Sequence, residues 1–227
     1  MKNVNKLFAQ MPAFFLISGC LFAQTGGFQH HGESPHHKFE DVDKWAEAFE
    51  DPERDAWQKP DEVIKAIDLS VHSTIADIGS ATGYFPIRFA RVAKEGKVFG
   101  VDIEQNMVDY LNERAAKEGL TNLESVLGET NDPKIPRQVD IVFICNTYHH
   151  IEERNKYFEN LLKYLTSDGK LVIVDFKKGD LPVGPGDSMK IAKEDVIQEI
   201  TSSGYKLSSS PSMLPYQYFL VFEVQTH

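Results

Sequence analysis

The sequence predicts a single α/β domain built on a doubly wound, mostly parallel seven-stranded sheet whose last strand runs antiparallel. Short apolar, β-branched runs alternate with segments of helical periodicity from about residue 74 onward. The first of these runs, IADIGSATG at 75–83, ends in small residues and two glycines, which let backbone approach a ligand closely. At 227 residues the chain suits one such domain better than two.

The expected elements follow one another in a regular order. Strands are expected at 74–79, 97–102, 123–127, 139–145, 170–176, 205–208 and 216–224. Helices are expected at 84–93, 105–118, 151–165 and 193–202. No helical pattern separates the last two strands, so they should pair antiparallel through the loop that contains Pro211 and Pro215.

A helical cap is predicted at residues 39–62, ahead of the main domain at 63–227. Its apolar residues recur at helical spacing, and Pro52 then breaks or restarts the helix. Large side chains favour packing of this cap onto the domain, with an ordinary core helix as the alternative; they are Trp45, Phe49 and Trp57. Residues 63–69 are expected to continue as a helix into the first strand.

Residues 1–23 have the pattern of an export leader, in which Lys2 and Lys6 precede an apolar run at 7–17. The segment ISGC at 17–20 resembles a bacterial lipobox, which would make the protein a lipoprotein attached to the membrane through Cys20. LFA at 21–23 would instead serve ordinary signal peptidase. We therefore expect an exported protein, and a cytoplasmic one if the leader is not functional. The run is shorter than the about 20 residues that span a membrane.

Residues 24–38 are expected to form a linker rich in glycine, histidine and serine. Its four histidines, at 30, 31, 36 and 37, could hold a divalent metal, but the segment offers no scaffold for one, so a solvated linker is favoured and no metal site is assigned. The second of the two cysteines, Cys145, lies in an apolar strand-like run, so no disulfide is expected either.

The chain is acidic, with a formal net charge of −10 that loss of the leader's two lysines would change to −12. Such a charge repels a phosphate backbone at long range. No run of Lys or Arg interleaved with aromatic residues offsets it locally. We therefore expect a small-molecule substrate and no nucleic-acid partner.

The glycine-rich turn differs from the dinucleotide-binding fingerprint GxGxxG. That fingerprint needs glycine at the second and third positions, where this chain has Ala81 and Tyr84. An NAD-dependent oxidoreductase is therefore disfavoured.

Acidic residues follow two of the predicted strands. Asp102 ends the second strand, 19 residues after Gly83, where a carboxylate can accept both hydroxyls of a ribose. A surface acid that caps the next helix is the alternative. Glu129 and Thr130 follow the third strand in the same manner and could meet the edge of a purine.

Three segments together resemble class I S-adenosylmethionine-dependent methyltransferases: DIGSATG at 77–83, GVDIExxM at 100–107 and DIVFICN at 140–146. The resemblance extends from Val63 to the C-terminus and implies a Rossmann-like fold with S-adenosyl-L-methionine as the cofactor. Further segments, at 49–60, 131–136 and 148–151, look like an uncharacterised bacterial subgroup, which indicates no substrate.

The resemblance also implies a set of cofactor-binding residues. Asp77 and Gly79 would lie near the methionine part, Asp102 on the ribose, Ile103 and Met107 against the adenine face, and Glu129 near the adenine amino group. The remaining candidates are Ser80, Ala81, Gly83, Thr130 and Asn146. Ala81 stands where the family most often has glycine, a substitution that such enzymes often tolerate.

His149 and His150 are the candidate catalytic residues, because they follow the fourth strand and imidazole titrates near neutrality. Methyl transfer from a sulfonium mainly requires positioning, an apolar cleft and sometimes a base. A packed histidine at a helix entry is the alternative. The loop at 179–190 is expected to act as a gate over the cleft or as a plain connection.

The predicted function is therefore methyl transfer to a small molecule. The alternative is an exported, non-catalytic ligand-binding or interaction protein that keeps the fold, since S-adenosylmethionine is made in the cytoplasm. Neither the methyl acceptor nor the oligomeric state is predicted.

Overall fold

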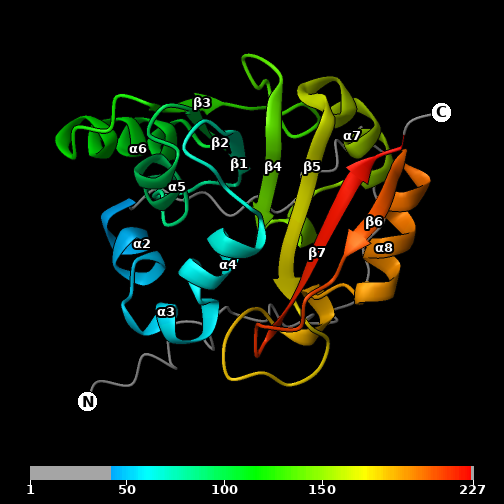
Figure 1. Ribbon diagram of the computed structural model, residues 1–227. Coiled ribbons are helices and arrows are strands. Elements are labelled where there is room, and N and C mark those ends of the chain that lie inside the picture. The colour runs from blue at the N-terminus through cyan, green and yellow to red at the C-terminus, as the bar shows by residue number, and fades with distance from the viewer. Residues whose placement is uncertain (1–41, 226–227) are drawn as a thin grey trace, which may run out of the picture.

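The computed structural model describes residues 42–225, which form a seven-stranded sheet in the order β3-β2-β1-β4-β5-β7-β6 (Figure 1). Strands β1 to β5 pair parallel, and β7 pairs antiparallel with both β5 and β6. The predicted fold class and the antiparallel pairing of the last two strands are confirmed. The strands are β1 Thr74–Ile78, β2 Lys97–Asp102, β3 Leu123–Leu127, β4 Val139–Cys145, β5 Leu165–Phe176, β6 Tyr205–Ser209 and β7 Gln217–Val224.

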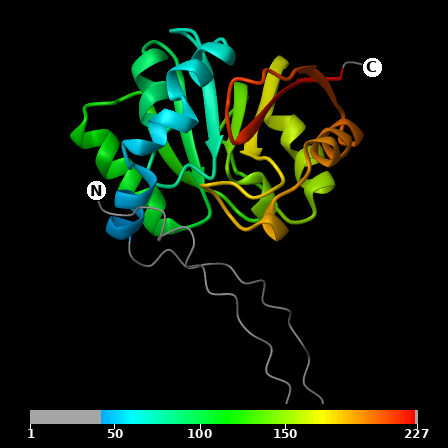
Figure 2. The same ribbon diagram turned by 90° about the horizontal axis from the view of Figure 1, so that it is seen from below.

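Helices flank the sheet on both faces (Figure 2). They are α2 Val42–Phe49, α3 Glu53–Gln58, α4 Pro60–Ala66, α5 Pro86–Val92, α6 Gln105–Lys117, α7 Arg154–Leu161 and α8 Lys193–Ser202, with 3-10 turns η1 Tyr148–His150, η2 Leu162–Tyr164 and η3 Asp187–Met189. The predicted leader with Cys20, the linker and Phe39 lie outside the described residues. Among residues 42–225, no helix combines the length and the apolar character needed to cross a membrane.

Two buried clusters form the core, one on each face of the sheet. Successive residues of β1 alternate between them: Ile75 packs with the cluster that includes residues of α4, α5 and α6, and Ala76 with the cluster that includes residues of α7 and α8. Burial on both faces explains why the central strands read as nearly continuous apolar runs. The helices of both faces therefore hold the ends of β1, β2 and β4 in fixed positions.

Several predicted boundaries were wrong. The helix expected at 84 begins at Pro86, because proline has a fixed φ and needs no N–H partner in the first turn. The helix expected at 151–165 covers only 154–161 before η2, since Leu165 already pairs with Val139 in β5. The pairing register shifts after Val139, so β5 also includes residues 166–169, which no expected helix or strand covered. Helix α4 crosses the expected boundary between cap and domain.

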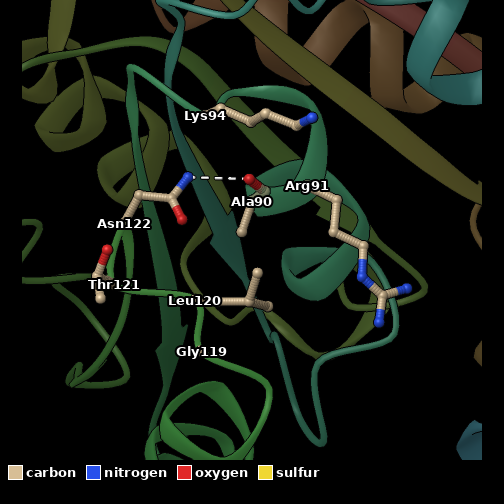
Figure 3. A pocket seen from close by; sticks show the side chains of 7 residues that line it. All are labelled: Ala90, Arg91, Lys94, Gly119, Leu120, Thr121 and Asn122. Atoms are coloured by element: carbon tan, nitrogen blue, oxygen red, sulfur yellow. Dashed lines mark hydrogen bonds between the residues drawn. The ribbon is translucent and has the colours of Figure 1, made fainter.

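A shallow surface pocket of about 410 Å³ lies at the amino ends of the strands, where α5 ends and β3 begins (Figure 3). The Asn122 side-chain amide donates hydrogen bonds to the carbonyls of Ala90 (2.9 Å) and Ala93 (2.8 Å) at the end of α5. The polar side chain of Asn122 in this pocket therefore caps the end of α5. The pocket lies at the opposite edge of the sheet from Asp102, which ends β2.

We expect Asn122→Ala to lower the free energy of unfolding by about 1–2 kcal/mol, because the Ala90 carbonyl loses the Asn122 donor and the Ala93 carbonyl keeps only the Gly96 N–H. Urea unfolding of the full chain measures this difference. Thr121→Ala, at the exposed neighbouring position, is the control and should change the free energy by less than about 0.5 kcal/mol. Equal effects of the two substitutions would contradict the capping role.

Candidate functional site

The loop between β1 and α5 crosses the carboxyl end of β2. The N–H groups of Gly79 and Ser80 both donate to the Val101 carbonyl, at 2.8 and 3.0 Å. Gly79 has a φ of +76°, and a Cβ there would lie 2.2 Å from Thr147 Oγ1. Gly83 has a φ of +99°, and a Cβ there would lie 2.4 Å from Leu111 Cδ1. Backbone conformation and space therefore both require these two glycines.

Asp102 fixes the middle of this loop. Its Oδ2 accepts a hydrogen bond from the Ala81 N–H at 2.9 Å, and its Oδ1 accepts one from the Glu104 N–H at 3.1 Å. Burial raises the pKa of Asp102, and these backbone donors oppose the rise. Each oxygen of a carboxylate can accept more than one hydrogen bond, so Asp102 keeps acceptor capacity at the strand end.

Asp77, at the carboxyl end of β1, is a buried acid without a hydrogen bond. Asp77 is 4% exposed, and no residue of 42–225 donates to its carboxylate. Burial raises the pKa of Asp77 well above its usual range, Arg54 lowers it, and Asp102 raises it further. Because the folded-state pKa is raised, the stabilising contribution of Asp77 is present at low pH and lost as the pH rises through that pKa. Such a group is typical of a functional site.

Apolar side chains are exposed on both sides of Asp102. Ile103 follows β2 and is 44% exposed, and Leu127 ends β3 and is 46% exposed. Of the two apolar residues predicted to face the adenine ring, Met107 is fully buried. Only Ile103 therefore has an exposed apolar surface that a ligand could contact. Leu127 was not predicted, although it precedes the Gly128-Glu129 segment that the sequence singled out.

The other cofactor candidates differ in their surroundings. The Ser80 hydroxyl is buried and lacks a hydrogen-bond partner within the described chain. Glu129 and Thr130 are exposed, and Glu129 forms an ion pair with Lys134 at 2.8 Å. Asn146 has a φ of +58°, and its Oδ1 accepts a hydrogen bond from Gln217 at 2.5 Å.

The two candidate catalytic histidines are placed differently. His149 Nδ1 lies 2.9 Å from Asp175 Oδ2, and the His149 side chain is 4% exposed, whereas His150 is exposed. Asp175 also accepts hydrogen bonds from the His149 and Phe176 N–H groups, so its carboxylate is held in place. A carboxylate on Nδ1 leaves Nε2 as the proton-accepting nitrogen. Asp175 is the penultimate residue of β5, and an acid near a strand's carboxyl end is a signal that the sequence contained.

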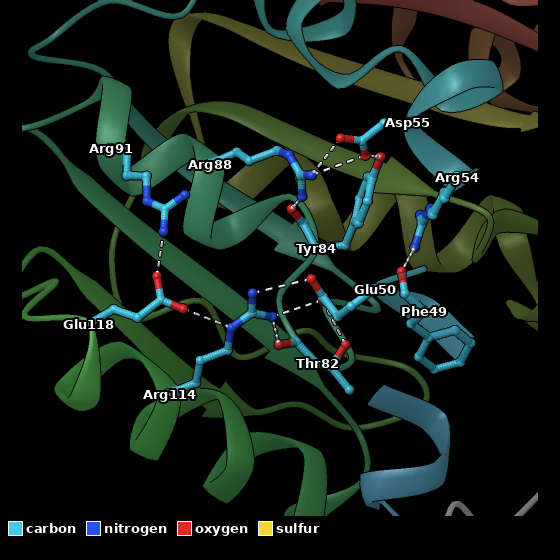
Figure 4. Close-up of polar contacts among 10 residues, drawn as sticks. All are labelled: Phe49, Glu50, Arg54, Asp55, Thr82, Tyr84, Arg88, Arg91, Arg114 and Glu118. Carbon is cyan, nitrogen blue, oxygen red and sulfur yellow. Dashed lines mark hydrogen bonds and ion pairs between the residues drawn. The ribbon is translucent and has the colours of Figure 1, made fainter. Parts of the chain in front are cut away.

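Helices α2 and α3 pack over the glycine loop through charged contacts (Figure 4). Glu50 accepts a hydrogen bond from the Thr82 hydroxyl at 3.0 Å and pairs with Arg114 at 2.8 Å. The Tyr84 hydroxyl donates to Asp55 at 2.5 Å. Residues of the segment predicted as a cap therefore contact the glycine loop directly.

Buried amides extend the contact between cap and sheet. Gln58 is fully buried, and its side-chain amide donates to Gln217 Oε1 at 2.9 Å. Trp57 packs against Phe176 and Tyr216, with ring centroids 5.9 and 6.5 Å apart. The loop after β5 folds on itself through a hydrogen bond from Lys190 Nζ to the Gly179 carbonyl, at 2.6 Å. Within residues 42–225, no three His, Cys, Asp or Glu side chains gather as a metal site.

Comparison with known proteins gives the family. Residues 69–213 match the family described as "Methyltransferase domain", which is more than half of the chain. The chain belongs to this methyltransferase family. A solved structure of a SAM-dependent methyltransferase from Aquifex aeolicus superposes with a TM-score of 0.75 at 27% identity, covering 81% of this chain and 98% of that one.

Two curated relatives are similar over shorter segments. Phosphoethanolamine N-methyltransferase 1 of Triticum aestivum is 26% identical over 115 residues, which are 51% of this chain and 23% of that protein. An uncharacterised methyltransferase of Bacillus subtilis is 25% identical over 122 residues, with 53% and 47% covered. The chain thus spans less than half the length of these relatives.

Ala81 adopts a left-handed backbone conformation, with a φ of +44°. We expect Ala81→Gly to raise the free energy of unfolding by up to about 1 kcal/mol, because glycine lacks the Cβ that is strained there. Ala81→Val is the matched control and should lower it by about 2 kcal/mol, since β-branched residues are outliers in this region. Urea unfolding distinguishes them. A loss of stability in both variants would show that the strain is not at this residue.

Proposed function

We propose that the protein transfers a methyl group from S-adenosylmethionine to a small-molecule acceptor. The observation that carries this proposal is the Asp102 carboxylate, held by the Ala81 and Glu104 N–H groups at the end of β2 with acceptor capacity left. Membership in the methyltransferase family supports it, as does the similarity to a structure described as SAM-dependent.

The residues around Asp102 fit the parts of this cofactor. Asp102 would accept the ribose hydroxyls, and the exposed apolar faces of Ile103 and Leu127 would cover the adenine ring. Gly79 would let backbone approach, and Asp77, a buried acid without a hydrogen bond, would accept one from the α-ammonium group. When bound, S-adenosylmethionine supplies a methyl group on an activated sulfonium. These residues of the chain would hold and orient it.

His149 is the proposed general base for an acceptor that must lose a proton. Its Nδ1 is held by Asp175, which fixes the ring and would stabilise the imidazolium after Nε2 takes the proton. The acidic net charge of −10 favours a small molecule over nucleic acid as the acceptor.

Calorimetric titration of the full chain tests cofactor use. We expect S-adenosylhomocysteine, the demethylated cofactor, to bind wild type, and Asp102→Asn to weaken binding about 10- to 100-fold through loss of the charged acceptor. Asp109→Asn, an exposed acid on α6 that bonds only to Gln105 within the described chain, is the control. Absence of binding by wild type, or unchanged binding by Asp102→Asn, would refute the proposal.

Transfer of a labelled methyl group to a panel of small hydroxyl, amine and thiol compounds tests the base. We expect His149→Gln to lower kcat about 10²- to 10⁴-fold while S-adenosylhomocysteine binding is kept. His150→Gln, at the exposed neighbouring histidine, should retain kcat within about threefold if only His149 acts as the base. Equal losses in the two variants would rule out the assignment to His149.

A further inference from the structure

Arg54 on α3 carries a buried N–H group without a hydrogen bond. Its Nε is buried and unpartnered within residues 42–225. Its Nη1 donates to the Phe49 carbonyl at 2.9 Å, and its Nη2 lies 3.4 Å from Gln58 Oε1. An N–H group that is buried without a hydrogen bond costs free energy unless a ligand accepts from it.

The guanidinium of Arg54 is held in a fixed plane. It lies over the Tyr84 ring at 3.7 Å from the centroid, and Arg88 lies over the same ring at 4.0 Å (Figure 4). The Tyr84 hydroxyl in turn donates to Asp55, the residue that follows Arg54 on α3. A stacked, planar guanidinium presents its donors in a geometry that suits a carboxylate.

Asp77 lies near Arg54 without forming an ion pair with it. The charge of Arg54 lowers the pKa of Asp77, yet no contact within 4.0 Å joins the two side chains. Asp77 lies near the carboxyl end of β1, and Arg54 comes from α3, stacked on Tyr84 in the segment that follows β1. The Arg54 cation and the buried Asp77 carboxyl, close but apart, match the carboxylate and the ammonium group of an amino acid, and the ammonium charge would favour the ionised form of Asp77.

We propose that Arg54 binds the α-carboxylate of the cofactor's methionine part while Asp77 binds its α-ammonium group. This inference rests on the proposed function and adds a residue of the cap to the cofactor site. It explains why Arg54 and Asp77 both have unused hydrogen-bonding capacity, since the ligand supplies what each lacks. The stacking of Arg54 on Tyr84 would then orient the guanidinium for the cofactor's carboxylate.

Two ligands separate this role from a merely structural one. S-adenosylhomocysteine has the amino acid, and 5′-methylthioadenosine has the same adenosine and sulfur without it. We expect Arg54→Met in the full chain to raise the Kd of S-adenosylhomocysteine about 10- to 100-fold and that of 5′-methylthioadenosine by less than about threefold. Calorimetry measures both constants and requires no acceptor.

Arg88→Met is the matched control, because it removes the other guanidinium from the Tyr84 ring. It should leave the ratio of the two Kd values unchanged even if the cap is loosened. Equal weakening of both ligands by Arg54→Met, or no weakening of S-adenosylhomocysteine, would overturn the inference and leave the proposed function standing. Failure of wild type to bind either ligand would overturn both.

Discussion

The hydrogen bond from the Ala81 N–H to Asp102 is the interaction on which the rest of the site depends. It closes the loop after β1 onto the end of β2, and the bonds from Gly79 and Ser80 to the Val101 carbonyl support it. Because Gly79 packs against Thr147 and Gly83 packs against Leu111, the loop has little freedom to move. The strained φ of Ala81 is tolerated because these contacts determine the path of the backbone.

This loop also positions the cap. The hydroxyl of Thr82 donates a hydrogen bond to Glu50 of the cap, and the hydroxyl of Tyr84 donates one to Asp55. The guanidinium of Arg54 stacks on the Tyr84 ring. The cap thus depends on the same short segment that Asp102 fixes. On the other side of β1, the buried pair His149 and Asp175 lies at the ends of β4 and β5. A cofactor at the loop and an acceptor at His149 would therefore meet between the cap and the sheet.

Much of the fold could be predicted from the sequence because its signals are local. Strands β2, β3 and β4 have the expected bounds, since each apolar run stops at an acid, a glycine or an asparagine. The irregular pairing at the start of β5 could not be predicted, because residues 166–169 are polar or glycine and lack the apolar pattern of a strand.

The candidate site was predicted only in part. The strand-end residues were identifiable, but Gln58 contacts Gln217 across 159 residues, and no local pattern indicates such a contact. Arg54 was missed for the same reason, because its position beside Tyr84 follows from the packing of the cap and not from the residues next to it in the sequence.

Hydrogen–deuterium exchange of the full chain, with and without S-adenosylhomocysteine, tests most directly whether cap and loop form one site. We expect the ligand to slow exchange at both 79–83 and 53–58. Slower exchange at 79–83 alone would contradict the account.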